Sequence, residues 1–269
     1  ILAASALAVD TADSAPPAIS AWQVVVNNSF EIPENTGRFY NSYNPPSVNA
    51  GALVVFRARS TGQQGGPVSG IYTRNMESLG AIEKIADRDT EVPQPNNTLY
   101  PVPGDPDADW ILSTFNEFPS FPRIAINADS VATRGNHQPV WTYEVGTDPV
   151  TGEPIETRVG TTGVYVNLQA TDPLGELVTG ASLLGAVPEF SDLFAVPGVD
   201  PATKFDVFPG APAITDAGVI AFKGNYAVDD PDSEDPEVTI GKTGVFYRPV
   251  TDAYAGGDDP IELVANSDT

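Results

Sequence analysis

The strongest constraint on the fold of this chain is an internal repeat. Three segments share one pattern: an apolar residue, then Asn or Thr, then a short polar or glycine-containing turn, then a run of strand-forming residues. They are residues 46–56, 124–134 and 212–222, in which Asn49, Asn127 and Thr215 align. Asn, Asp and Gly at a tight turn are typical of a β-hairpin. A repeated unit of this size predicts that neighbouring units bury their apolar faces against one another.

Further elements follow each hairpin in the same order. A glycine followed by an apolar and an aromatic residue comes first, a second apolar run comes next, and a pair of phenylalanines ends the first two copies. The glycines are Gly70, Gly163 and Gly244, and the phenylalanine pairs are Phe115 with Phe118 and Phe205 with Phe208. We therefore predict units of four short strands in the order hairpin, strand, strand and aromatic return.

Turn residues are spread along the whole chain. The 269 residues include 24 Gly and 26 Pro, and short runs rich in Val, Ile, Phe and Tyr lie between them, which is typical of strands. We predict an all-β domain over residues 21–269, with about three repeated four-stranded antiparallel units that are propeller-like or form an open stack. The units lie near 46–118, 122–208 and 212–269. Runs expected to be strands include Trp22–Val26, Leu53–Phe56, Ile124–Ile126, Gly163–Val166, Val219–Phe222 and Gly244–Tyr247.

The hairpin motif resembles that of bacterial secreted or surface proteins with tandem NxxGxxAF repeats, a propeller-like family with varied cell-surface anchors. Residues 215–222 (TDAGVIAF) fit the motif with Thr in place of Asn. Residues 49–56 keep the Asn and the Phe but have Ala52 at the glycine position, and residues 127–134 keep only the Asn. The resemblance covers roughly residues 30–269 and implies a propeller-like surface protein. It implies no catalytic residue.

The repeat is expected to be out of phase with the ends of the chain. The third unit stops at residue 269 before any aromatic return, whereas residues 30–43 (FEIPENTGRFYNSY) hold such aromatic residues just before the first hairpin. We therefore expect residues 21–45 to complete the third unit, either in the same chain or in a neighbouring copy. An unfinished unit leaves an open strand edge, and an open edge recruits a strand. A contact between copies that does not close gives a head-to-tail polymer.

Residues 1–20 form a separate N-terminal arm whose first nine residues (ILAASALAV) are apolar. These nine residues are either the remnant of a secretory signal, because 6–8 (ALA) has the form of a cleavage site, or an ordered arm that acts as a donor strand. We expect self-association through apolar residues of the arm, of the segment after it and of the last strand. They are Ile1, Leu2, Leu7, Val9, Val24, Val26, Leu263 and Val264.

Composition excludes several classes of function. The chain has no Cys and one His, which leaves no disulfide framework, thiolate metal site or two-histidine centre. Its net charge of -23 opposes binding to nucleic acid. No apolar run approaches the roughly 20 residues that a membrane-spanning helix requires. The expected partners are therefore neither nucleic acid nor the interior of a membrane.

Two acidic segments contain carboxylates that could surround a hard cation such as calcium. The first contains Asp105, Asp107 and Asp109, and the second contains Asp229, Asp230 and Asp232. Neither has the glycine or the distant glutamate of an EF-hand loop, and the alternative is a solvated acidic loop that maintains solubility. Calcium is a candidate ligand at both, and no cofactor is required.

No residue pattern points to catalysis. His137 has no nucleophile elbow to serve, and among 36 acidic residues a suitably spaced pair carries no weight as a glycosidase signal. Trp110 and Trp141 lie outside the repeat and are candidates for stacking on sugar rings. We predict a non-enzymatic structural protein, extracellular or at the cell surface, that forms a head-to-tail homopolymer by strand complementation. The alternative is a closed, propeller-like binding module for a glycan or another surface ligand.

Overall fold

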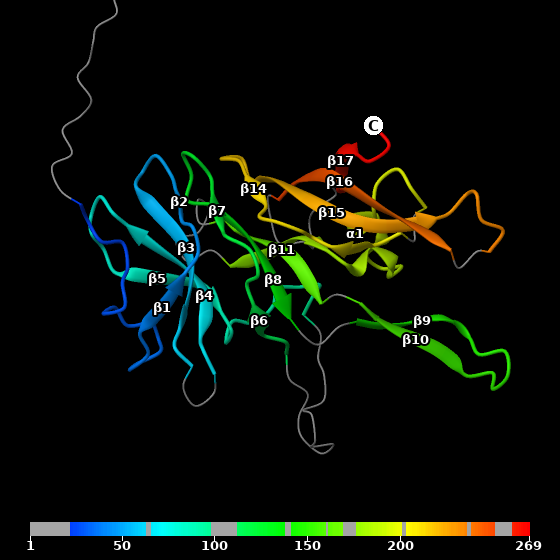
Figure 1. The fold of residues 1–269 in the computed structure, drawn as a ribbon, viewed down its shortest axis with the longest axis horizontal. Helices are drawn as coiled ribbons and strands as arrows, with labels where there is room; N and C mark the ends of the chain where they lie inside the picture. The colour runs from blue at the N-terminus through cyan, green and yellow to red at the C-terminus, as the bar shows by residue number, and fades with distance from the viewer. Residues whose placement is uncertain are drawn as a thin grey trace, which may run out of the picture.

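Three five-stranded antiparallel sheets make up most of the computed structural model (Figure 1). The structure describes residues 22–62, 66–97, 112–137, 141–159, 161–168, 176–200, 203–235, 238–250 and 260–269. Sheet 1 contains β1 (Tyr40–Tyr43), β2 (Ser47–Val48), β3 (Leu53–Ser60), β4 (Ser69–Asn75) and β5 (Ile82–Asp87). Sheet 2 contains β6 (Phe115–Glu117), β7 (Arg123–Ile124), β8 (Val131–His137), β11 (Thr162–Asn167) and β12 (Leu177–Ser182). Sheet 3 contains β13 (Phe205–Val207), β14 (Ala213–Ile214), β15 (Val219–Asp229), β16 (Thr239–Pro249) and β17 (Glu262–Asn266).

All three sheets share one strand order. Across sheet 1 the order is β1-β3-β4-β5, and β2 also pairs with β3. Sheet 2 repeats this order as β6-β8-β11-β12 with β7 beside β8, and sheet 3 repeats it as β13-β15-β16-β17 with β14 beside β15. The prediction of an all-β fold built from about three repeated antiparallel units is therefore confirmed.

The registers of the sheets also agree. Gly135 pairs with Gly163 in sheet 2, and Gly224 pairs with Gly244 in sheet 3. A β-bulge interrupts the last strand pair of every sheet at the same place. The equivalent pair in sheet 1 is Ala58 with Gly70. In sheet 2 an aromatic ring requires the glycine, because a Cβ on Gly135 would come within 2.5 Å of the Phe115 ring.

The phase of the repeat differs from the prediction. The paired aromatic residues open each unit and do not close it, because Phe115 and Phe205 begin the first strands of sheets 2 and 3, and Tyr40 begins that of sheet 1. The strands of each sheet lie within residues 40–87, 115–182 and 205–266. A repeat has no intrinsic start, and spacing alone does not show whether an edge strand pairs with the strand before it or after it.

Residues 21–45 do not complete sheet 3 of their own chain. In that segment β1 pairs with β3 of sheet 1, and sheet 3 takes all its strands from its own unit. Sheet 3 also has the same five strands as the other two sheets. The expectation of a third unit that lacks its aromatic strand is therefore wrong.

The middle hairpin is one residue longer than the other two. The first and third hairpins enclose residues 49–53 and 215–219, whereas the pairing of Ile124 with Val131 encloses residues 125–130. A shift of one residue moves every side chain of a strand to the other face of the sheet. The counterpart of Asn49 and Thr215 is therefore Ala125, two residues before Asn127, and the alignment of the strand after the turn is offset by one residue.

This register also changes which residue of the middle unit corresponds to Phe56 and Phe222, the phenylalanines that end the motif. Phe56 pairs with Tyr72 and Phe222 pairs with Phe246, and the equivalent partner of Tyr165 is Thr133. Arg134 therefore lies on the opposite face of its sheet.

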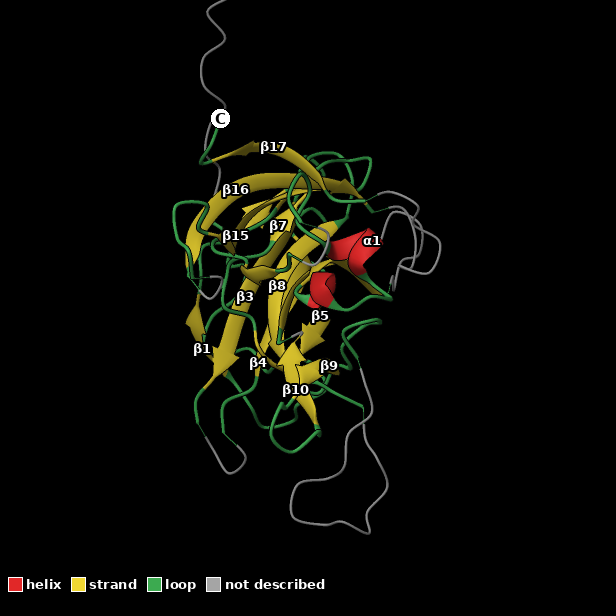
Figure 2. Ribbon diagram, turned by 90° about the vertical axis from the view of Figure 1, so that its right-hand side faces the viewer, coloured by secondary structure: helices red, strands yellow, loops and turns green. Residues whose placement is uncertain are grey.

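The sheets pack face to face in an open row, so the fold is the open-stack form of the prediction (Figure 1). One core lies between sheets 1 and 2, and a second lies between sheets 2 and 3. The first contains Val55, Ile71, Ala86, Phe115, Phe118, Val131 and Tyr165, and the second contains Ala132, Val164, Ala181, Phe205, Phe222 and Phe246. The 3₁₀-helix η1 (Leu184–Ala186) and the short helix α1 (Ser191–Phe194) add Leu184 and Phe194 to the second core. Figure 2 shows α1 on one side of the sheets.

Residues 22–39, which we call the cap segment, cover the outer face of sheet 1. Val25, Val26, Phe30 and Ile32 join a third core with Tyr40, Phe56 and Tyr72. The segment contains no strand, and only an isolated bridge joins Glu31 to Phe39. The predicted strand at Trp22–Val26 is therefore wrong.

A two-stranded ribbon extends from sheet 2. It consists of β9 (Trp141–Thr147) and β10 (Pro154–Val159), which lie between β8 and β11 in the sequence and project away from the stack in Figure 1. Among the described residues, no helix has the length and apolar character needed to span a bilayer.

Candidate functional site

Each sheet has two faces with different chemistry. The aromatic face carries the paired aromatic residues that open the unit and the aromatic residue of the fourth strand. The opposite face, which we call the docking face, consists of four positions that the registers make equivalent. They are Val55, Arg57, Ile71 and Ala86 in sheet 1, then Ala132, Arg134, Val164 and Ala181 in sheet 2, then Ala221, Lys223, Val245 and Ala265 in sheet 3.

The docking faces of sheets 1 and 2 are buried by the aromatic face of the next sheet. Val55, Ile71 and Ala86 are 0% exposed, beneath Phe115 and Phe118 of sheet 2. Ala132, Val164 and Ala181 of sheet 2 are equally buried, beneath the phenylalanines of sheet 3. Docking face against aromatic face is therefore the contact that holds the stack together.

The basic residues of the two buried docking faces have different partners: Arg57 donates to Asn44 of its own unit at 3.0 Å, and Arg134 reaches the next unit. Burial lowers the pKa of Arg57, Arg59 lowers it further, and the charge of Glu117 in the next unit opposes both effects. Arg134 donates a hydrogen bond from Nη1 to the carbonyl oxygen of Phe208 in sheet 3. The second docking face thus offers a cation to the unit that follows it.

The docking face of sheet 3 has the same residue types and is exposed. Val245 is 44% exposed, and Lys223 and Ala265 are exposed as well. A shallow hollow of about 260 Å³ lies there, lined by Lys223, Val245 and Ala265 among others. The ammonium group of Lys223 makes no hydrogen bond or ion pair with any other residue that the structure describes. The stack of described residues therefore ends in an exposed docking face, which we call the tail.

The last strand of the tail is also an exposed edge. Four of the five residues of β17 are exposed, whereas the equivalent strands β5 and β12 are largely buried or half-buried. Leu263 is 36% exposed and Val264 is 58% exposed, and the strand carries no Lys or Pro of the kind that blunts sheet edges. Among the described strands β17 pairs only with β16, so its outer edge has no strand partner within that part of the chain.

The opposite end of the stack, the head, is covered by the cap segment, and arginine holds this segment in place of strand pairing. The Nη1 group of Arg74 donates to the carbonyl oxygens of Val24 and Val25, at 3.1 and 2.8 Å. The same guanidinium lies over the Phe30 ring, 5.0 Å from its centroid. These contacts satisfy backbone carbonyls that a strand partner would otherwise satisfy, which explains why the segment packs without joining the sheet.

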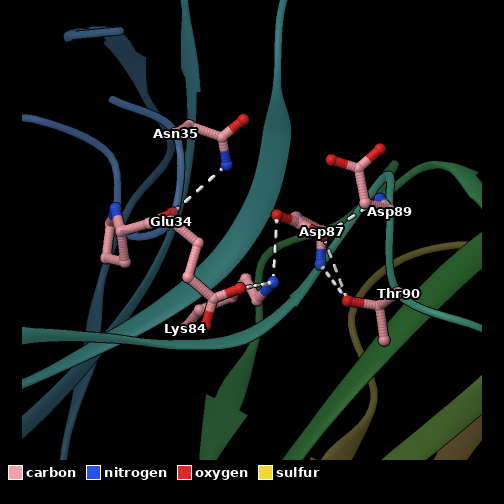
Figure 3. A network of polar contacts seen from close by, with 7 residues as sticks. Glu34, Asn35, Lys84, Asp87, Asp89 and Thr90 are labelled. Atoms are coloured by element: carbon pink, nitrogen blue, oxygen red, sulfur yellow. Dashed lines mark hydrogen bonds and ion pairs between the residues drawn. The ribbon is translucent and has the colours of Figure 1, made fainter. Parts of the chain in front are cut away.

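A polar network ties the cap segment to β5 (Figure 3). The ammonium group of Lys84 binds the Glu34 carboxylate of the cap segment and lies 3.5 Å from the fully buried carboxylate of Asp87. The other Asp87 oxygen accepts the Asp89 amide and the Thr90 hydroxyl, at 3.0 and 3.1 Å. Partial burial lowers the pKa of Lys84, but the hydrogen bond to Glu34 and the charges of Asp87 and Glu34 outweigh it and raise the pKa above 10.5.

The head still exposes aromatic side chains. Trp22 is 92% exposed, Phe39 is 42% exposed and Tyr43 is 39% exposed. Tyr43 holds the position of Phe118 and Phe208 in the aromatic pair, yet those two rings are 0% and 1% exposed. The head and the tail therefore both present apolar side chains at positions that are buried inside the stack.

The three hairpins form a ladder along the stack. The side-chain amide of Asn49 donates to the carboxylate of Asp129 in the second hairpin, at 2.9 Å. The backbone and side-chain amides of Asn127 donate to the carboxylate of Asp216 in the third hairpin, each at 2.7 Å. Those two bonds hold the pKa of Asp216 below its ordinary value of 3.8. Sequence reasoning assigned Asn127 to its own turn and did not find its role between units.

The residues predicted to mediate self-association separate into three groups. Val24, Leu263 and Val264 are exposed, at the head and on the tail edge. Val26 is half-buried and packs into the core under the cap segment. Ile1, Leu2, Leu7 and Val9 lie outside the described residues, as does the whole predicted arm of residues 1–20.

The two acidic segments have different outcomes. Asp105, Asp107 and Asp109 lie outside the described residues. Asp229 ends β15, and the Asp230 carboxylate accepts the Asp232 amide at 2.9 Å, which closes the turn locally. Within the described part of the chain, no three His, Asp or Glu side chains lie close enough to share a metal ion. Calcium at these loops stays a prediction.

His137 belongs to the first core. Its side chain is 1% exposed, and its ring centroid lies 6.3 Å from that of Phe115 and 6.1 Å from that of Tyr165. It pairs with Phe115 across β6 and β8, where sheet 3 pairs Phe205 with Tyr226. His137 therefore takes the place of a core aromatic residue.

A cavity of about 830 Å³ lies beside β13, β15 and β16. Its lining combines apolar side chains such as Val228 and Ile240 with two lysines. Lys204 pairs with Asp206 at 2.8 Å and Lys242 pairs with Asp268 at 2.5 Å, so both cations already have partners. No family model, curated protein or solved structure matches the chain.

Proposed function

We propose that the protein is a non-enzymatic structural subunit that acts outside the cell or at the cell surface and associates head to tail with copies of itself. The observation that carries this proposal is the exposed edge strand β17 at the tail. An open edge offers unpaired backbone groups, and strand addition supplies their partners while alternate side chains fix the register. A contact of this kind between unlike ends continues from copy to copy.

The donor in this proposal is the apolar segment of residues 1–9 of the neighbouring copy. Its length of nine residues exceeds the five residues of β17, and its apolar character suits the exposed Leu263 and Val264. The net charge of -23 opposes association at low ionic strength, because like-charged copies repel each other. At the salt concentration outside cells this repulsion is screened beyond about 8 Å.

Deletion of residues 1–20 tests the donor, and substitution in β17 tests the acceptor. We expect the full chain to form long polymers, seen by sedimentation velocity and negative-stain microscopy, and the deleted chain to stay monomeric. Val264→Lys should prevent growth because a lysine on an edge strand opposes pairing, whereas Val264→Thr, a matched control of similar shape, should not. Polymers formed by the deleted chain would overturn strand complementation.

A second candidate function is binding of a glycan or another surface ligand in the cavity beside β13, β15 and β16. The size of about 830 Å³ suits a ligand of several sugar rings or a short peptide. The described residues do not form the closed, propeller-like ring. In such a ring the aromatic face of sheet 1 would contact sheet 3, but the cap segment covers that face. A glycan array probed with the purified chain tests this function, and Ile240→Asp should remove any signal that depends on the cavity.

A further inference from the structure

We propose that the docking face of sheet 3 is the tail half of a contact between copies, and that the head of a second copy, around Trp22, Phe39 and Tyr43, covers it. This inference rests on the head-to-tail order of the proposed function. It concerns a sheet face and not the strand edge, so the two contacts are tested by different substitutions.

The equivalent faces of sheets 1 and 2 indicate what kind of surface would cover the docking face of sheet 3. Ile71, Val164 and Val245 occupy equivalent positions, and each pairs with an alanine of the last strand: Ala86, Ala181 or Ala265. In sheets 1 and 2 these pairs are covered by aromatic rings of the next unit. The face of a sheet that is exposed to solvent commonly carries polar residues. The apolar pair of Val245 and Ala265 is instead typical of a buried face. Sheet 3 therefore keeps a surface suited to a neighbour.

The basic residue defines the second requirement for the partner. Arg134 donates to the carbonyl oxygen of Phe208, just after the first strand of the following unit, whereas Arg57 donates to Asn44 of its own unit at 3.0 Å. Lys223 occupies the same position in sheet 3, opposite Val245. It is exposed and lacks a polar partner among the described residues. The occupant must therefore bring aromatic side chains and an oxygen acceptor together.

The head of a second copy meets both requirements. Its exposed rings are Trp22, Phe39 and Tyr43, of which Tyr43 is the counterpart of the rings that cover the other two docking faces. Glu31 is exposed and pairs with Phe39 in an isolated bridge, which places a carboxylate beside one of these rings. A carboxylate at the head and the ammonium group of Lys223 at the tail are complementary, which favours the unlike pairing.

Cysteine cross-linking tests the pairing directly, because the chain contains no Cys. Trp22→Cys and Val245→Cys change exposed side chains, and Val150→Cys on the β9–β10 turn, which is 90% exposed, is the matched control. We expect a disulfide-linked dimer, seen on a non-reducing gel, when Trp22→Cys and Val245→Cys chains are mixed. We expect none when either is mixed with Val150→Cys. A dimer formed by Val245→Cys alone would show tail-to-tail pairing and overturn the proposal.

Charge substitutions on the same face give a second measurement. Val245→Glu should reduce association by tenfold or more in sedimentation equilibrium, and Lys223→Glu should reduce it further, whereas Val150→Glu should leave it unchanged. If the native chain polymerises and Val245→Glu polymerises equally well, the docking face is not an interface although the proposed function stands. If deletion of residues 1–20 leaves the polymer intact while Val245→Glu abolishes it, strand complementation fails and the docking face stands. A native chain that stays monomeric at all concentrations overturns both.

Discussion

Val245 stands in sheet 3 where Val164 stands in sheet 2, yet Val164 is 1% exposed and Val245 is 44% exposed. The two side chains have the same register, the same bulge beside them and an alanine partner each. The difference in their exposure comes from the neighbour: sheet 3 covers Val164, and no described residue covers Val245 to the same extent. Valine at the same position of the repeat is therefore a core residue in sheet 2 and a surface residue in sheet 3.

This pair gives a matched test of the stack. Val164→Thr keeps the shape but buries a hydroxyl at the contact between sheets 2 and 3, so we expect a loss of about 1–3 kcal/mol in the free energy of unfolding. Val245→Thr should change it by no more than about 0.5 kcal/mol in the monomer. Urea unfolding at a concentration where the chain is monomeric measures both. Equal effects of the two substitutions would contradict the stacked arrangement.

The glycines under the aromatic rings should not tolerate a side chain. A Cβ on Gly224 would come within 2.6 Å of the Phe205 ring, so Gly224→Ala must displace that ring or the strand. We expect a loss of about 1–3 kcal/mol, the usual cost of overpacking a core. Gly241→Ala, where nothing lies within 4 Å, is the control in a neighbouring strand. Thermal unfolding followed by circular dichroism distinguishes the two, and a neutral Gly224→Ala would contradict the close packing.

The contribution of Lys84, which binds the cap segment through Glu34, to the free energy of unfolding should depend on pH. The pKa of Lys84 is raised above its ordinary value of 10.5, so its contribution to stability is fully present below pH 10.5 and is lost as the pH rises through the folded-state pKa. Lys84→Met removes the titrating group. We expect this variant to be less stable than the native chain at pH 8, with a difference that shrinks above pH 10.5. A difference that stays constant to pH 12 would show that Lys84 acts by packing alone.

The contact between the second and third hairpins can be measured through the pKa of the Asp216 carboxylate. The pKa of Asp216 is held below 3.8 by the backbone and side-chain amides of Asn127, so this contact is present above pH 3.8 and weakens as the pH falls through the lowered pKa. Carboxyl carbon chemical shifts measured by NMR report that pKa. Asn127→Ala removes the side-chain donor and keeps the backbone donor, so the pKa should rise part of the way to 3.8. No change would place the two hairpins apart in solution.

Much of the fold follows from the sequence because repetition makes each weak signal recur. The strands at Leu53, Gly163, Val219 and Gly244 were predictable from short apolar runs between turn residues. The point in the sequence at which each unit begins was not predictable. The edge strands that begin at Phe115 and Phe205 have the same sequence pattern whether they end one unit or start the next.

The middle hairpin and the head needed information that spacing does not hold. One additional residue before Val131 moves Arg134 to the docking face, and only the pairing partners reveal it. In the cap segment the carbonyl oxygens of Val24 and Val25 accept hydrogen bonds from Arg74, which is distant in sequence. The exposure of Val245 depends on a missing neighbour and not on any local pattern.

The shared register of the three sheets has a consequence for how such a chain evolves. Sheets 1 and 2 each present a docking face to the aromatic face of the sheet that follows, so a duplicated copy of the middle unit, inserted beside the original, would meet a docking face on one side and an aromatic face on the other. The length of the array can then change by gene duplication and loss, while the surfaces at its two extremities are inherited unchanged.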